Sequence, residues 1–211
     1  MGRPRKFNID HALDAATELF WRNGYEATSL TDLTDAMGIS PPSFYSAFQS
    51  KDELFLRIVQ RYSTAQAKVI DEALAKSTPV EIIRVLMDGI ATLFTDPGQV
   101  PGCLIMNSAL PVTDGVPFRK VFANQREELR LRLRNRLLTV SAKNEFSPPP
   151  LDASTISRLV LSVYWGMAIE AQSGASRKEV RAIGNALVRL LEGRQPTQLQ
   201  HGCDVNRDNK I

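Results

Sequence analysis

The sequence has few cysteines and histidines, and this scarcity excludes several kinds of site. Cys103 and Cys203 are the two cysteines among 211 residues, which is too few for a disulfide framework or a zinc cluster. We therefore predict no metal site and no cofactor. His11 is expected in the first helix and His201 in the tail, so neither is placed to activate a nucleophile. The sequence predicts that the protein is not an enzyme.

Long hydrophobic runs are also missing. The most apolar stretch, residues 159–169, is too short to cross a membrane. The chain starts MGRPRKF and continues with Asn8 and Asp10 instead of an apolar core, so we expect no secretory signal. We therefore expect a cytoplasmic protein with no membrane partner.

The net positive charge is small, and within residues 1–53 the basic side chains are concentrated at the start. The net charge is +3, and residues 1–53 contain five basic side chains against eight acidic ones. Three of these basic residues, Arg3, Arg5 and Lys6, come before residue 7. DNA binding by this segment must therefore use a basic arm and a few placed donors, because a broadly basic face is missing.

The hydrophobic periodicity is helical almost throughout, and no segment shows the confident alternation of a strand. The predicted fold class is all-α, with an N-terminal three-helix domain at 1–52, a C-terminal helical domain at 53–193, and a disordered polar tail at 194–211. In addition to two short helices after residue 28, the pattern predicts helices over about residues 9–23, 51–76, 79–96, 118–142, 152–174 and 176–193.

Residues 28–53 have the boundary residues of a helix-turn-helix. Thr28 or Ser29 can cap one short helix, Gly38 can end it with a left-handed residue, and Ser40 can cap the next helix. Two short helices joined by such a tight turn are typical of the elements that read DNA.

The outer side of the second short helix is the predicted reading surface, because Phe44 and Phe48 are expected to face the core. Tyr45 is interpreted as a phosphate donor, and Lys51 opens a helix whose N-terminus favours an anion. The serines at the helix starts can also serve only as caps, and both interpretations stay open. The candidate DNA-binding residues are Arg3, Arg5, Lys6, Thr28, Ser29, Thr31, Ser40, Pro41, Pro42, Ser43, Tyr45, Ser46 and Lys51.

The last two helices are hydrophobic on more than one face. One face can join the core and another can pack on a second copy, which favours a four-helix homodimer interface over a monomeric core. A two-fold dimer would read a palindrome in double-stranded DNA through successive major grooves. The candidate interface residues are Leu159, Val163, Met167, Val180, Leu187 and Leu191.

The middle helices combine aromatic residues, methionines and a few polar groups, as small-molecule pockets do, although ordinary helical cores share this composition. Cys103 is interpreted as a buried thiol, with a reactive thiol as the alternative. The five arginines from Arg126 to Arg136 are interpreted as a solvated face instead of a second nucleic-acid surface. The candidate pocket residues are Met87, Phe94, Cys103, Met106, Asn107, Phe118, Phe122, Tyr164, Trp165 and Glu170.

The helix-turn-helix belongs to a longer pattern of residues. It reads Phe20…Gly24-Tyr25…Thr28-Ser29…Leu33…Met37-Gly38-Ile39-Ser40…Phe44-Tyr45…Phe48…Ser50-Lys51…Leu54. This pattern resembles the TetR family of bacterial transcriptional regulators, and the segments Gly102-Cys103-Leu104 and Gly174-Ala175-Ser176-Arg177 resemble an AcrR-type branch. The resemblance implies a homodimer that binds DNA through its N-terminal domain and an inducer through its C-terminal domain. It also implies phosphate contacts from Tyr45 and Lys51 and hydroxyl contacts from Thr28, Ser29 and Thr31.

We therefore predict a ligand-responsive DNA-binding regulator, a repressor that binds a palindromic operator as a homodimer. A small-molecule inducer would favour a dimer geometry that no longer fits successive grooves. Two alternatives keep the DNA-binding domain. One is a regulator that senses thiol oxidation or electrophiles through Cys103, and the other is a constitutive DNA-binding protein without an inducer.

Overall fold

A computed structural model describes residues 7–109, 118–140 and 152–193, and within these ranges the chain forms helices and no strand. This confirms the predicted all-α class. None of the described helices combines the length and the hydrophobicity needed to span a bilayer. In chain order the helices are α1 (Ile9–Asn23), α2 (Leu30–Met37), α3 (Pro41–Phe48), α4 (Lys51–Leu74), α5 (Pro79–Phe94), α6 (Leu104–Ala109), α7 (Phe118–Val140), α8 (Ala153–Gln172) and α9 (Arg177–Leu191).

Capping side chains decide where the helices begin. Ser29, and not Thr28, caps α2, because its hydroxyl accepts from the Asp32 amide at 3.1 Å while the Asp32 carboxylate accepts from the Ser29 amide at 2.8 Å. Asp152 caps α8 by accepting from the Ser154 amide at 2.8 Å, so the helix begins after Asp152. The choice between Thr28 and Ser29 that the sequence left open is therefore resolved by which side chain reaches the unpaired amides.

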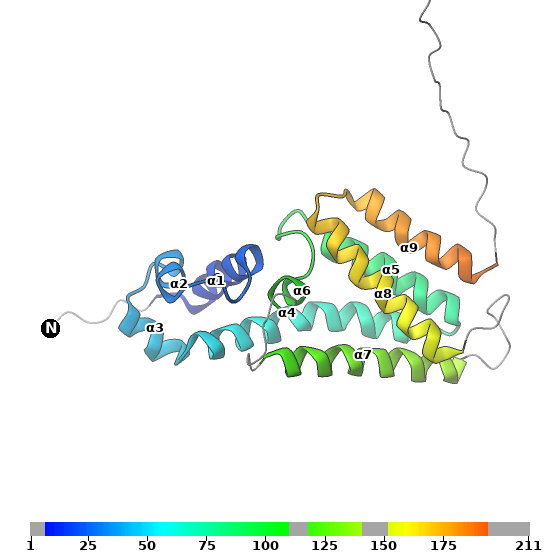
Figure 1. Ribbon diagram of the computed structural model, residues 1–211, viewed down its shortest axis with the longest axis horizontal. Helices are drawn as coiled ribbons and strands as arrows, with labels where there is room; N and C mark the ends of the chain where they lie inside the picture. The colour runs from blue at the N-terminus through cyan, green and yellow to red at the C-terminus, as the bar shows by residue number, and fades with distance from the viewer. Residues whose placement is uncertain (1–6, 110–117, 141–151, 194–211) are drawn as a thin grey trace, which may run out of the picture.

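The N-terminal unit consists of α1, α2, α3 and the start of α4, and it lies at one end of the molecule (Figure 1). Its core combines aromatic and leucine side chains, and each of the four helices contributes at least one that is fully buried. The fully buried members are Phe20, Leu33, Phe44, Leu54 and Phe55.

The C-terminal unit packs α5 against α4 and α9, while α7 packs on α8 and runs beside α4 (Figure 1). The closest approach of α5 and α9 is at Gly184, where an added Cβ would lie 2.7 Å from the Cβ of Met87. A side chain at this position would push the two helices apart. The tail from residue 194 and the loops at 110–117 and 141–151 lie outside the described residues.

The two units share α4, which runs without interruption from Lys51 to Leu74. A predicted domain boundary after residue 52 would therefore fall inside the first turn of a continuous helix.

Candidate DNA-binding surface and effector pocket

The turn between α2 and α3 is built as the sequence indicates. Gly38 has φ 63° and ψ 35°, the left-handed conformation that glycine adopts at little cost. Ser40 caps α3 by accepting from the Ser43 amide at 3.4 Å, and Pro41 occupies the first helical position. The turn therefore holds α3 at a fixed angle to α2.

The exposed side of α3 carries no charged residue. Phe44 and Phe48 are buried and fix the opposite side in the core, which confirms their predicted role. Tyr45 is 53% exposed, and its ring meets the edge of Phe44 with centroids 5.6 Å apart. Pro41 and Ser46 are exposed beside it. The surface can therefore offer hydroxyl groups and apolar contacts to a partner, but no ion pair.

Lys51 supplies the positive charge next to α3. Its ammonium group lies 4.2 Å from the centre of the Tyr25 ring, and the Tyr25 hydroxyl donates to the Asp52 carboxylate. Burial, followed by the hydrogen bond to Asp52, raises the pKa of Tyr25, so the hydroxyl stays protonated as a donor. Partial burial lowers the pKa of Lys51, while the carboxylates of Glu26 and Asp52 oppose this shift. The side chain is therefore held at the N-terminus of α4, where an anion is favoured.

Most of the candidate DNA-binding residues that the structure describes lie at the surface. Ser43 and Lys51 are half-buried. Arg3, Arg5 and Lys6 lie outside the described residues. The exposed candidates are Ser29, Thr31, Ser40, Pro41, Pro42, Tyr45 and Ser46.

The structure contradicts the assignment of Thr28 as a phosphate donor. Its side chain is fully buried, and its hydroxyl donates to the Gly24 carbonyl at 2.7 Å. Thr28 received a DNA-contacting role as one of the hydroxyl contacts that the family resemblance implies. Its hydroxyl instead closes the turn between α1 and α2.

Gln49 was not among the candidates, although it lies exposed directly after α3. Its φ is 62°, an uncommon conformation for a residue with a side chain. Nothing in the sequence signals this strain, because glutamine has no special preference for positive φ. The conformation turns the chain sharply between α3 and the Lys51 end of α4.

Two substitutions, Thr28→Val and Lys51→Met, distinguish the role of the buried Thr28 hydroxyl from the role of the Lys51 charge. Thr28→Val is expected to lower the free energy of unfolding by about 1 kcal/mol, the usual contribution of one hydrogen bond. It should leave the affinity for DNA unchanged, because the buried hydroxyl is not presented to a partner. Lys51→Met should reduce the salt slope of DNA binding by about one for each half-site, and the affinity by roughly tenfold. Chemical denaturation measures the change in stability, and fluorescence anisotropy at several salt concentrations measures the affinity and its salt slope. A clear loss of DNA affinity in folded Thr28→Val would restore Thr28 as a DNA contact.

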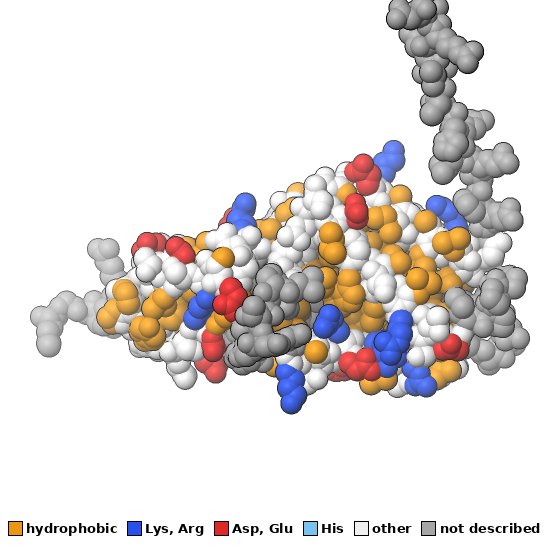
Figure 2. All heavy atoms as spheres, viewed as in Figure 1, with side chains coloured by type: hydrophobic (Ala, Val, Ile, Leu, Met, Phe, Trp, Pro, Cys, Tyr) orange, Lys and Arg blue, Asp and Glu red, His pale blue; other side chains and the backbone are white. Residues whose placement is uncertain are grey.

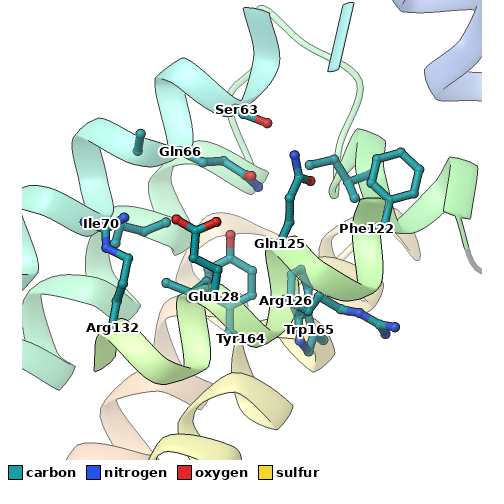
Figure 3. A pocket seen from close by; sticks show the side chains of 13 residues that line it. Ser63, Gln66, Ile70, Phe122, Gln125, Arg126, Glu128, Arg132, Tyr164 and Trp165 are labelled. Carbon is teal, nitrogen blue, oxygen red and sulfur yellow. The ribbon is translucent and has the colours of Figure 1, made fainter. Parts of the chain in front are cut away.

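A pocket of about 150 Å³ lies between α4, α7 and α8 (Figure 3). Its apolar wall includes Phe122, Tyr164 and Trp165, three of the predicted pocket residues. Gln66 of α4 and Gln125 of α7 add polar groups to the inner wall. The remaining lining residues are Ser63, Ala67, Ile70, Ile105, Arg126, Glu128, Leu129 and Arg132.

The other candidate pocket residues lie elsewhere. Asn107 donates to the Trp21 carbonyl at 3.1 Å and so ties α6 to α1. Glu170 is exposed on α8, and the Phe118 side chain lies outside the described residues. Met87, Phe94, Cys103 and Met106 belong to the buried core and do not line the pocket.

Three of the five arginines from Arg126 to Arg136 bond to acidic side chains or backbone carbonyl groups of the chain. Arg130 pairs with Glu127, and Arg132 pairs with Asp71 of α4 at 2.5 Å. Arg136 donates to the Lys76 carbonyl at 2.8 Å. These contacts join α7 to α4 and its C-terminal end, next to the pocket.

Cys103 is buried behind the pocket wall. The Gln66 amide donates to its sulfur at 3.5 Å and to the Tyr62 hydroxyl at 3.3 Å. Burial raises the pKa of the Cys103 thiol, so at neutral pH it is protonated and a poor nucleophile. Because the folded pKa is raised, the thiol contributes full stability below its ordinary pKa of about 8.5, and this contribution falls as the pH rises above that value.

Alkylation should reveal this protection. In a Cys203→Ser background, iodoacetamide at pH 8 is expected to label Cys103 about 100-fold more slowly in the folded protein than in urea. Mass spectrometry of quenched samples gives both rates. Equal rates would support the alternative of a thiol-sensing regulator.

The exposed faces of α8 and α9 carry a band of apolar side chains that has no partner within the described chain. Leu159 is partly exposed as predicted, while Ile169 and Leu190 are 49% and 65% exposed. Figure 2 shows hydrophobic side chains gathered over α8 and its border with α9, above the charged side chains of α7. Val163 is half-buried between the band and the core.

Four of the predicted interface residues are instead buried inside the chain. Their side chains face α5 and each other within the C-terminal unit, since α9 packs on both α5 and α8. The faces that carry these hydrophobic stripes therefore belong to the core of the chain and are not free to contact a second copy. These four residues are Met167, Val180, Leu187 and Leu191.

The fold and the helix-turn-helix define the class of protein as a DNA-binding transcriptional regulator, and comparisons agree. Residues 12–58 match the family described as bacterial regulatory proteins, tetR family. The chain is 31% identical to the HTH-type transcriptional repressor ComR of Escherichia coli (strain K12) over 192 residues, which cover 90% of this chain and 91% of ComR. It belongs to the TetR family, whose members are regulators and not enzymes.

Solved structures give the same result. A cysteine mutant of the TetR family transcriptional regulator CifR, complexed with 26bp double-strand operator DNA, has a TM-score of 0.76 and 29% identity, covering 89% of this chain and 98% of that chain. The TetR regulator of Rhodococcus sp. RHA1 has a TM-score of 0.59 and 34% identity, covering 85% and 97%.

Proposed function

We propose that the chain is a ligand-responsive transcriptional repressor that binds a palindromic operator as a homodimer and is released by a small-molecule effector. The observation that carries the proposal is the continuity of α4. Lys51 begins this helix beside α3, and Ser63, Gln66 and Ile70 of the same helix line the pocket. The repressor activity named for ComR and the operator DNA in the CifR complex support the same function.

The proposed DNA contacts use the exposed side of α3 in the major groove. Pro41 and Pro42 would pack on thymine methyl groups, while Ser43 and Ser46 would donate to or accept from base edges. Tyr45 and Lys51 would bind phosphates and set the register of α3. The basic arm at residues 1–6 would supply further charge in the adjacent minor groove.

The proposed dimer uses the exposed apolar band, centred on Leu159, Ile169 and Leu190. Large apolar side chains at these positions are unusual on a monomer surface when they form one band across two helices. Two helices from each copy would form a four-helix interface. The two-fold axis would place one α3 from each copy in successive major grooves, as a palindrome requires.

Two chains of contacts lead from the pocket to the DNA-binding unit and support release by an effector. Phe122 of the pocket contacts Phe55 with ring centroids 6.1 Å apart, and Phe55 lies 5.0 Å from the ring of Tyr25, which holds Lys51.

The second chain begins at Gln66. Its amide donates to the Tyr62 hydroxyl, and the Tyr62 ring meets the edge of Trp21 in α1 with centroids 5.0 Å apart. An effector that moves Phe122 or Gln66 would therefore shift α4 and α1 together, and select a dimer with different α3 spacing.

The test is the binding of the purified full chain to palindromic DNA from the region upstream of its own gene. Fluorescence anisotropy should give saturable binding with a stoichiometry of whole dimers per site, and light scattering should give the mass of a dimer. Addition of a pocket ligand should lower the affinity for DNA. Failure to bind any upstream palindrome, or a monomeric mass, would overturn the proposal.

A further inference from the structure

The size of the pocket limits its occupant to about one ring. Its volume is about 150 Å³. A cavity of this volume in a helical protein is known to hold one benzene-sized molecule.

The walls favour an aromatic ring over an alkyl chain. Phe122 comes from α7, and Tyr164 and Trp165 come from α8, with the last two rings 4.5 Å apart and nearly perpendicular. A planar ring can meet these side chains by edge and face contacts, which aromatic pairs prefer. Ile70 and Ile105 close the remaining apolar sides.

One polar atom of the pocket has no partner. The Oε1 atom of Gln125 is buried and accepts no hydrogen bond among the described residues. Gln66, opposite it, has its amide group engaged with Tyr62 and Cys103. Figure 3 shows Gln66 and Gln125 extending toward each other from α4 and α7, above the hydroxyl of Tyr164. A ligand that donates a hydrogen bond to Gln125 would satisfy this acceptor.

Three charged side chains, Arg126, Glu128 and Arg132, also line the pocket. Arg126 and Glu128 are exposed, and Arg132 is paired with Asp71. In Figure 3 the guanidinium of Arg126 points away from the aromatic side chains. The aromatic side chains and the two glutamines are neutral, so an ionised group placed against them would lose its hydration without a counter-charge there.

We infer that the pocket binds an uncharged single-ring aromatic molecule that carries a hydrogen-bond donor, of the phenol class, with its donor directed to Gln125. The inference rests on the proposed function in treating this molecule as the effector. The ring fills the space between Phe122 and Trp165, and the hydroxyl group donates a hydrogen bond to the Oε1 atom of Gln125.

Four ring compounds test the class by titration calorimetry of the full chain. Phenol is neutral with a donor, anisole is neutral without one, and benzoate and benzylamine are ionised at neutral pH. Phenol should bind about tenfold more tightly than anisole, because one hydrogen bond to a buried acceptor distinguishes them. Benzoate and benzylamine should bind more weakly than phenol. The fluorescence of Trp165 in a Trp21→Phe background reports binding independently.

A matched pair of variants locates the donor. Gln125→Met keeps the length of the side chain but removes the amide, and should reduce the preference of phenol over anisole to less than about twofold. Gln60→Met changes an exposed glutamine of α4 outside the pocket and should keep the full preference. Circular dichroism establishes that both variants fold. If Gln125→Met does not fold, the wild-type ranking of the four compounds decides the class alone.

Equal binding of phenol and anisole, tighter binding of either ion, or no binding by any of the four would overturn the inference. Operator binding is measured separately with phenol present. Phenol binding without a change in operator affinity would support the assigned pocket chemistry and contradict release by the effector. Release of the operator by a different compound class would support the proposed function and contradict the inference.

Discussion

The double substitution Ile169→Asp and Leu190→Asp is expected to convert the protein from a dimer to a monomer. Both side chains project from the apolar band on α8 and α9 and are at least about half exposed in the single chain. Aspartates on this band would be desolvated without partners in the proposed interface. Affinity for a palindromic site should fall by about 100-fold or more, because two linked half-site contacts become one. Light scattering and fluorescence anisotropy measure the two effects.

The matched control for this experiment is Leu138→Asp. Leu138 is 54% exposed on α7, away from the apolar band, so its substitution should leave both mass and affinity unchanged. Circular dichroism should show native helix content in all variants. A double variant that stays dimeric would contradict the proposed interface, and loss of the dimer with Leu138→Asp would move the interface to α7.

The substitution Phe55→Ala should destabilise the chain by about 3–5 kcal/mol, the usual cost of removing a buried phenylalanine. Phe55 is fully buried at the junction of the two units. Its ring lies 5.0 Å from Phe20 and 6.1 Å from Phe122, so the cavity would open toward both cores. Urea denaturation followed by circular dichroism measures the change in the free energy of unfolding.

Leu131→Ala is the control for this loss of stability. Leu131 is 39% exposed on α7, and its truncation should cost well under 1 kcal/mol, as surface changes usually do. If Phe55→Ala costs as little as Leu131→Ala, the aromatic junction does not hold the two units together. The contact chain from Phe122 to Lys51 would then lose its structural basis.

The starts of the helices were predictable from the sequence because capping is local. Ser40 and Ser176 each cap the helix that follows them, and each bonds an amide three residues further on. Gly38 ends α2 for an equally local reason, since its backbone needs a left-handed conformation. Such information lies within one turn of the chain. The fold class follows from it together with the helical periodicity.

The partners of the buried faces were not predictable in the same way. Val180 and Leu187 belong to a regular hydrophobic stripe. Such a stripe predicts that this face of the helix is buried, but it does not predict which element covers it. Here α5 covers them, because Gly184 lets that helix approach closely. Leu190 lies on α9 outside this stripe, roughly a quarter of a turn away, and remains exposed. The sequence therefore identified the helices of the proposed interface but not their outward side.

The polar residues of the pocket were missed for a related reason. Gln66 and Gln125 lie on long helices with many charged neighbours, and a glutamine on such a helix is usually solvated. Only the packing of α7 against α8 and beside α4 brings them to one cavity. Phe122, Tyr164 and Trp165 were found because large aromatic residues are conspicuous in any sequence. Their arrangement around one volume still required the structure.

In the proposed mechanism, the uninterrupted helix α4 would carry a movement at the pocket to Lys51, and the distance between the two sites sets the size of the displacement. At 1.5 Å per residue, Lys51 lies about 22 Å along the axis from Gln66. A tilt of only about 5° around the pocket would therefore displace the Lys51 end by about 2 Å. Opposite displacements in the two copies of a dimer would change the separation of their lysines by about 4 Å, more than the range over which a hydrogen bond to phosphate holds. In the proposed dimer, a ligand of a few heavy atoms would therefore be large enough to control the fit of the two copies to DNA.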